Sequence, residues 1–267
     1  MRPLIEKNKQ LVSIVMPAYN CEEKIHHAIE SVKSQTYCNW ELIIVDDCSK
    51  DETLRVIENY ANSDKRILSL KNIRNKGAAE SRNIATDKAL GHYIAFLDSD
   101  DFWSKDKLLN QITFMESNSY DFTYTYYEVK KEDQRKRIIY KAPKILNKIK
   151  MSFMCPIGCL TVMYNVKKIG KIYAPKLQRR NDYILWIEII RKSKLAFCLN
   201  QNLATYKVNN AGLSSSKLLN IYYYFKVIKL SYKYWYLILP LTTPIYLLLI
   251  LIKKTTPEFY NIIIKNL

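Results

Sequence analysis

Aspartate side chains that could bind a metal follow two apolar segments of the sequence. They are Asp46, Asp47, Asp98, Asp100 and Asp101. Such a group of carboxylates repels itself unless a cation neutralises it, and hard oxygen ligands favour Mg²⁺ or Mn²⁺ over zinc. A cation held by one or two carboxylates, with phosphate oxygens at its other positions, is a usual way to bind a diphosphate leaving group. The aspartates therefore predict a divalent-metal site for a phosphorylated substrate.

An aspartate after a strand can also serve as a helix N-cap or a turn former. That alternative stays open for any one of the five taken alone. A third polar cluster, Pro17 to Asn20, follows the first apolar segment of the chain. Polar clusters at three strand ends together favour a shared site over three separate turns.

The first hundred residues alternate between short apolar segments and segments with helical periodicity. Strands are predicted at 11–16, 40–45, 66–70 and 92–97, with helices at 25–32, 51–60 and 77–90. Strands of continuous β-branched and apolar residues separated by helices are typical of a mostly parallel sheet covered on both faces. Ligands bind beyond the carboxyl ends of such strands, so the three polar clusters should converge there.

From about residue 120 the alternation is less regular. Strands are predicted near 122–129, 137–140, 158–164, 195–198 and 204–208, and helices at 182–191 and 218–234. The basic excess also lies in this half. Residues 121–267 contain 26 Lys and Arg against 7 Asp and Glu, a net charge of +19, and 16 of the 21 tyrosines. Such a surface attracts nucleic acid, anionic lipid or phosphorylated substrates, and composition does not choose among them.

Residues 235–252 form an almost uncharged segment interrupted by Pro240 and Pro244. Its length is at the lower limit for crossing a bilayer, and lysines and aromatic residues flank it as they do at a membrane interface. Three interpretations remain open: an interfacial or re-entrant anchor, a buried or oligomer-forming segment, and a single membrane span. Residues 1–10 are polar and lack the apolar core of a signal peptide, which favours a protein that is not secreted.

Four motifs in order resemble the donor-binding half of family 2 glycosyltransferases. They are VSIVMPAYN, WELIIVDDCSKDET, NKGAAESRNIA and GHYIAFLDSDDFW, and they span residues 12–103. The resemblance continues more loosely through IGCLTVMYN and RRNDYILWIEII to about residue 215. It implies an α/β fold of the GT-A nucleotide-sugar type and an inverting, metal-dependent transfer. The relatives it is most similar to are bacterial capsule, lipopolysaccharide and teichuronic-acid transferases.

Carried over by residue, the resemblance implies a donor site and a catalytic base. Asp98 and Asp100 match the family's DXD motif and would hold Mn²⁺ or Mg²⁺, and Asp182 is the candidate base. Arg82 would lie beneath the donor, or it would pair with Asp98 or Asp47. The residues implied for the nucleotide-sugar donor are Pro17, Tyr19, Asp47, Arg82 and Asp98.

The expected organisation is a glycosyltransferase domain over 1–215 and a tail over 216–267. The donor-binding half is about 11–120 and the acceptor half about 121–215. The resemblance implies a UDP-sugar donor and a lipid-linked glycan acceptor at the cytoplasmic face of the bacterial inner membrane. The alternatives are an inactive scaffold subunit of a polysaccharide-synthesis complex and a basic nucleic-acid-binding protein. Nucleic acid is not expected as a partner because no RNA-binding motif is present.

Overall fold

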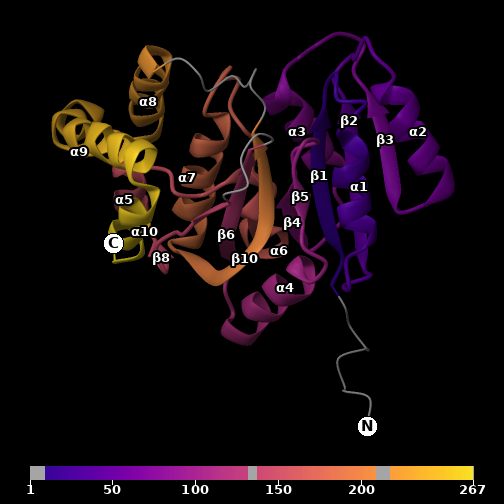
Figure 1. Ribbon diagram of the computed structural model, residues 1–267, viewed down its shortest axis with the longest axis horizontal. Coiled ribbons are helices and arrows are strands. Elements are labelled where there is room, and N and C mark those ends of the chain that lie inside the picture. The colour runs from indigo at the N-terminus through magenta and orange to yellow at the C-terminus, as the bar shows by residue number, and fades with distance from the viewer. Residues whose placement is uncertain (1–9, 132–136, 209–216, 267) are drawn as a thin grey trace.

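Four apolar segments of the first half pair side by side as parallel strands. They are β1 (Val12–Ala18), β2 (Trp40–Asp46), β3 (Ile67–Lys71) and β4 (Tyr93–Phe96), paired in the spatial order β3-β2-β1-β4. The computed structural model describes residues 10–131, 137–208 and 217–266 (Figure 1). The carboxyl ends of these strands lie at one edge of the sheet, as predicted.

The second half extends the sheet with strands of both directions. It adds β5 (Phe102–Trp103), β6 (Phe122–Lys131), β7 (Ile138–Tyr140), β8 (Ile145–Leu146), β9 (Met163–Asn165) and β10 (Ala196–Val208). From β4 the described sheet continues β9-β6-β10-β5, with β7 beside β6 and β8 beside β10. Strands β6 and β10 pair in parallel, whereas β9 pairs antiparallel with both of its neighbours. The predicted α/β fold class is confirmed.

Side chains alternate between two cores along the parallel strands. Val15 and Ile43 face helices α3 (Ala78–Lys88) and α7 (Asn181–Ser193). Ile14 and Leu42 face the opposite side of the sheet. Helices α1 (Ile25–Lys33), α2 (Thr53–Ser63) and α4 (Lys107–Asn118) supply buried residues there. Strands β1, β2 and β4 are therefore buried on both faces, which explains their almost continuous hydrophobic sequence.

Two predicted elements of the second half differ from the structure. The strands expected at 195–198 and 204–208 are one strand, β10, whose pairing with β6 shifts register between Leu199 and Thr205. The polar residues between them are accommodated by these irregularities rather than by a loop. The strand expected at 158–164 is a 3₁₀ turn, Cys159–Thr161, followed by the short β9.

Three helices form the C-terminal tail, defined here as the described residues 217–266. They are α8 (Lys217–Ser231), α9 (Trp235–Thr255) and α10 (Pro257–Asn266). Pro240 and Pro244 were expected to break the apolar segment, yet both lie inside α9. The hydroxyl of Thr242, between them, donates to the carbonyl of Ile238 one turn earlier in the helix (3.0 Å).

The tail packs on the outer side of α7, at the end of the molecule opposite α2 and β3 (Figure 1). The rings of Tyr224 in α8 and Tyr246 in α9 stack with centroids 3.8 Å apart. The hydroxyl of Tyr224 donates to the carbonyl of Ser152 in the short helix α5 (Lys148–Phe153), at 2.8 Å. The tail is therefore docked through aromatic packing and buried hydrogen bonds.

Candidate active site

Arg82 lies where three elements meet and connects two of the predicted site segments. One terminal nitrogen donates to the carboxylate of Asp98 after β4 (2.5 Å), and the other donates to the side chain of Asn181 at the start of α7 (3.1 Å). The arginine is only 8% exposed. Of the two roles expected for Arg82, pairing with Asp98 is present in the structure.

Asp182 follows Asn181 in the first turn of α7 and is partly buried. Burial raises the pKa of its carboxyl, and the nearby positive charge of Arg82 opposes that rise. The net result is that the pKa of Asp182 is raised. A carboxylate whose pKa is raised is better matched to accept a proton near neutral pH, so the environment suits the predicted base.

The aspartates after β4 have unequal surroundings. Asp101 is 1% exposed, and one of its oxygens accepts a hydrogen bond from the backbone N–H of Lys207 at 3.1 Å. Burial, together with the charges of Asp98 and Asp100, raises the pKa of the Asp101 carboxyl well above its usual range. Asp101 therefore supports the β4 end from inside, while Asp98 and Asp100 are partly exposed.

Asp46 and Asp47 have hydrogen-bond partners outside that group. Asp46 is fully buried and accepts from the backbone of Ser49, in its own turn, at 3.1 Å. Asp47 accepts from the backbone N–H groups of Lys76 (2.8 Å) and Gly77 (2.7 Å). Up to five carboxylates were expected near one site, but no group of three or more potential metal ligands forms among the described residues.

The Asp47 bonds fix the loop that leads into α3. Gly77 has a φ of +86°, a conformation that side-chain-bearing residues rarely adopt, and its N–H points at the carboxylate of Asp47. Pro17 and Tyr19, also implied for the nucleotide-sugar donor, lie at the end of β1 and directly after it. Pro17 is buried, whereas Tyr19 is 45% exposed and presents its ring at the surface.

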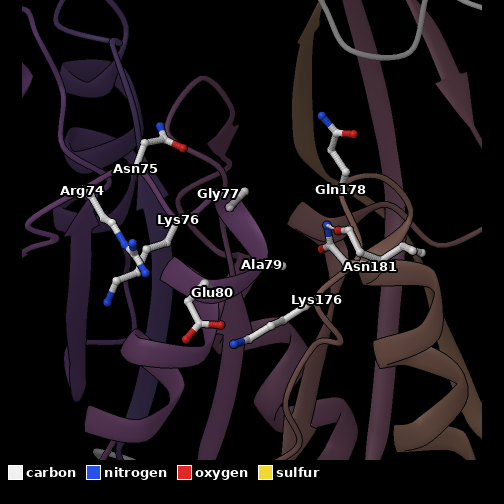
Figure 2. Close-up of a pocket in the computed structure, with 11 residues that line it drawn as sticks. Arg74, Asn75, Lys76, Gly77, Ala79, Glu80, Lys176, Gln178 and Asn181 are labelled. Carbon is white, nitrogen blue, oxygen red and sulfur yellow. Dashed lines mark hydrogen bonds between the residues drawn. The ribbon is translucent and has the colours of Figure 1, made fainter.

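A cavity of about 780 Å³ lies between this loop and the segment that precedes α7 (Figure 2). It is lined by Arg74, Asn75, Lys76, Gly77, Ala78, Ala79, Glu80, Lys176, Leu177, Gln178 and Asn181. Three of these residues are cationic and one is anionic, so the cavity favours an anionic ligand. Asn181 joins the cavity to the Arg82 network.

The cationic lining was missed by sequence reasoning. Arg74 and Lys76 stand in the loop after β3, which is another carboxyl strand end, so the strand-end rule could have included them. No local signal marks Lys176, which meets them only through folding. In Figure 2 the side chains of Lys176 and Glu80 point toward one another across the cavity.

A smaller cavity of about 210 Å³ borders Asp100. It is lined by Lys24, His27, Ser31, Asp100, Phe102, Lys130 and Lys207. The carboxylate of Asp100 thus stands beside a basic hollow at the edge of the sheet. Negative and positive groups at one place can hold a cation and a phosphate together.

The Glycosyl transferase family 2 profile matches residues 13–164, which covers β1 to β9 and the Arg82–Asp98 pair. The chain belongs to glycosyl transferase family 2. It is a glycosyltransferase, as the sequence motifs predicted.

Two relatives of this family 2 chain with named activities come from bacteria. The chain is 39% identical over 211 residues to a Bacillus subtilis (strain 168) protein named as a teichuronic acid biosynthesis glycosyltransferase, TuaG, covering 78% of this chain and 83% of that one. It is 40% identical over 208 residues to the Escherichia coli UDP-Glc:alpha-D-GlcNAc-diphosphoundecaprenol beta-1,3-glucosyltransferase WfaP, covering 78% and 81%. The expected kinship with envelope glycan transferases is confirmed.

A solved structure shares the fold of this family 2 chain. S. aureus TarS 1-349, in complex with UDP-GlcNAc, superposes with a TM-score of 0.68 at 21% identity. The match covers 83% of this chain but 65% of TarS 1-349, just under two thirds. At this identity the likeness shows the fold, and it confirms the expected GT-A architecture.

The residues of this family 2 chain fit a cation that arrives with a nucleotide. Asp98 has one oxygen held by Arg82 and a side chain that is 29% exposed, and Asp100 is partly exposed two residues further on. Mg²⁺ and Mn²⁺ need only one or two protein carboxylates when substrate phosphates fill the other positions. Asp98 and Asp100 therefore suit a cation that is shared with substrate phosphates, rather than one coordinated by protein ligands alone.

Proposed function

We propose that this glycosyltransferase moves a sugar, with inversion, from a UDP-sugar to a hydroxyl of a lipid-linked glycan precursor. The observation that carries the proposal is the Arg82 network, because it joins Asp98 of the DXD motif to Asn181, which precedes the candidate base Asp182. The residue implied for donor binding and the segment with the candidate base are thereby linked through one buried arginine. The names of WfaP and of the TarS complex, which include UDP-Glc and UDP-GlcNAc, support UDP as the nucleotide.

In the proposed transfer, Asp182 accepts the proton of the acceptor hydroxyl while the oxygen of that hydroxyl bonds to the anomeric carbon of the sugar. The bond from that carbon to the diphosphate oxygen breaks, and the electron pair leaves with the nucleotide. Asp98 and Asp100 would hold Mn²⁺ or Mg²⁺, which would neutralise the diphosphate as it leaves. Pro17, Tyr19 and Asp47 would line the pocket for the uracil ring of the nucleotide.

The tail supports a membrane location for this reaction. Within the described residues, α9 alone is long and apolar enough to cross a bilayer, at 21 residues, and only 17% of its most apolar stretch is buried. Exposed apolar side chains continue onto its neighbours, for example Phe225 in α8 and Phe259 in α10. An interfacial helix flanked by lysines at the cytoplasmic face of the inner membrane would bring the site to a lipid-linked acceptor.

Nucleotide titration tests the donor half of the proposal. Isothermal titration with UDP and with GDP, each with and without Mn²⁺, should show Mn²⁺-dependent binding of UDP. Asp100→Asn should weaken that binding about tenfold or more, because it removes a charged ligand of the cation. Asp87→Asn, at an exposed position near the end of α3, is the matched control and should bind as wild type does. Absence of UDP binding under every metal condition would refute the donor assignment.

A further inference from the structure

The start of α7 also contacts the tail. The guanidinium of Arg180, the residue before α7, lies over the ring of Tyr246 in α9, 5.5 Å from its centroid. Arg180 has a φ of +58°, in the left-handed region that non-glycine residues seldom occupy. The backbone at this point is thus held in an uncommon conformation beside the tail.

Tyr246 has a buried hydroxyl without a partner. The residue is 3% exposed, and its hydroxyl oxygen makes no hydrogen bond within the described structure. The Nε of Arg180 is likewise buried and unpaired. Buried polar groups are nearly always hydrogen-bonded, because leaving one unpaired is costly. Two donors without acceptors at one contact indicate a place for an acceptor-rich ligand.

The charge at this contact is positive. Lys253 lies two turns after Tyr246 on α9, and burial, together with the nearby charge of Arg180, lowers the pKa of its ammonium group. Its ammonium packs over the rings of Tyr140 (4.5 Å) and Tyr260 (5.6 Å). Neither Arg180 nor Lys253 forms an ion pair with a carboxylate in the described part of the chain. Two neighbouring cations without such a partner favour an anion between them.

The contact adjoins the candidate base. Arg180 is two residues before Asp182, and their charges interact. Asp182 raises the pKa of the Cys155 thiol, whereas Arg180 and Lys253 lower it, so these groups occupy one neighbourhood. A ligand anion here would lie beside the acceptor hydroxyl, and its lipid would extend toward the exposed apolar side chains of α9.

We infer that Arg180, Tyr246 and Lys253 bind the diphosphate of the lipid-linked acceptor. This assignment rests on the proposed function and adds a subsite to it. A diphosphate supplies several acceptor oxygens for the Tyr246 hydroxyl and the Arg180 Nε, and its charge balances the two cations. The membrane-associated tail would thereby contribute to substrate binding as well as to anchoring.

Binding of farnesyl diphosphate in detergent solution tests the subsite. Wild type should bind farnesyl diphosphate at least about tenfold more tightly than farnesyl monophosphate, and farnesol should bind weakest, because the diphosphate supplies the most acceptors. Tyr246→Phe and Lys253→Met should each weaken diphosphate binding about tenfold. Lys253→Arg should restore it. Lys254→Met removes the same charge from the adjacent exposed position and should change binding less than twofold.

Two further titrations separate the possible failures. UDP binding, measured on the same samples, reports the donor site, and its absence would count against the proposed function itself. If UDP binds but farnesyl diphosphate does not, or if Lys254→Met weakens binding as much as Lys253→Met, the subsite is refuted. Phosphatidylglycerol vesicles report general attraction to anionic lipid. Equal loss of vesicle binding in both lysine variants, with diphosphate binding lost only in Lys253→Met, would support the subsite.

Discussion

Helix α7 begins between two sets of buried polar side chains, which differ in how many hydrogen-bond partners the protein provides. One set is around Arg82, and the other is formed by Arg180 and Tyr246. On the sheet side, both terminal nitrogens of Arg82 have partners, Asp98 and Asn181, although its Nε has none. On the tail side, Arg180 and Tyr246 each keep a buried polar atom without a partner. On the sheet side the chain supplies partners for both terminal nitrogens of the arginine, whereas on the tail side it supplies none, among the described residues, for the Tyr246 hydroxyl. This difference agrees with the proposal of a donor side that is preorganised and an acceptor side that a ligand would complete.

The largest expected effect lies at Asp182, between the two sides. Asp182→Asn keeps the size of the side chain but cannot accept a proton, so kcat should fall by about 10²- to 10⁴-fold. UDP release from UDP-sugars in the presence of a prenyl-linked acceptor measures the rate. UDP affinity should stay within twofold of wild type. A variant that retains more than about one third of the wild-type kcat would remove Asp182 from the catalytic role.

On the sheet side, Arg82→Lys tests how much the network depends on the arginine geometry. Lysine keeps the charge near Asp98 but cannot reach Asn181 at the same time. The loss of a hydrogen bond from a charged donor should lower the free energy of unfolding by about 1.5–3 kcal/mol. Urea denaturation measures it. Arg74→Lys, at an exposed position in the cavity wall, should change stability by less than about 0.5 kcal/mol.

The pH profile reports the electrostatic balance at Asp182. Burial raises the pKa of this carboxyl above its usual value of 3.8; Asp98 raises it further, while Arg82 and Arg180 lower it. The base acts when ionised, so kcat should fall as pH drops through the raised pKa, by about tenfold per pH unit below it. Arg180→Gln removes one stabilising charge and should move the acid limb to higher pH. An acid limb that moves to lower pH would contradict this balance.

The two sides also differ in how far sequence alone predicts them. The strand-end motifs predicted that Asp98 lies at the carboxyl edge of the parallel strands, a rule that needs only periodicity, and the structure has it just after β4. The bond from Arg82 to Asn181 spans 99 residues, and no local pattern encodes such a separation. The Arg180–Tyr246 contact depends on how α9 docks. The proline positions predicted an interrupted segment, whereas packing keeps one helix.

The smallest expected effect tests the docking of the tail itself. The buried hydroxyl of Tyr224 donates to Ser152 and lies 2.6 Å from the Thr242 hydroxyl in α9. Tyr224→Phe keeps the ring stacked on Tyr246 and should cost about 1 kcal/mol of unfolding free energy. Tyr222→Phe, whose side chain is 50% exposed, should cost less than about 0.5 kcal/mol. Equal losses in the two variants would mean that these hydrogen bonds do not hold α9 against the catalytic domain, and the tail side of α7 would then depend on aromatic stacking alone.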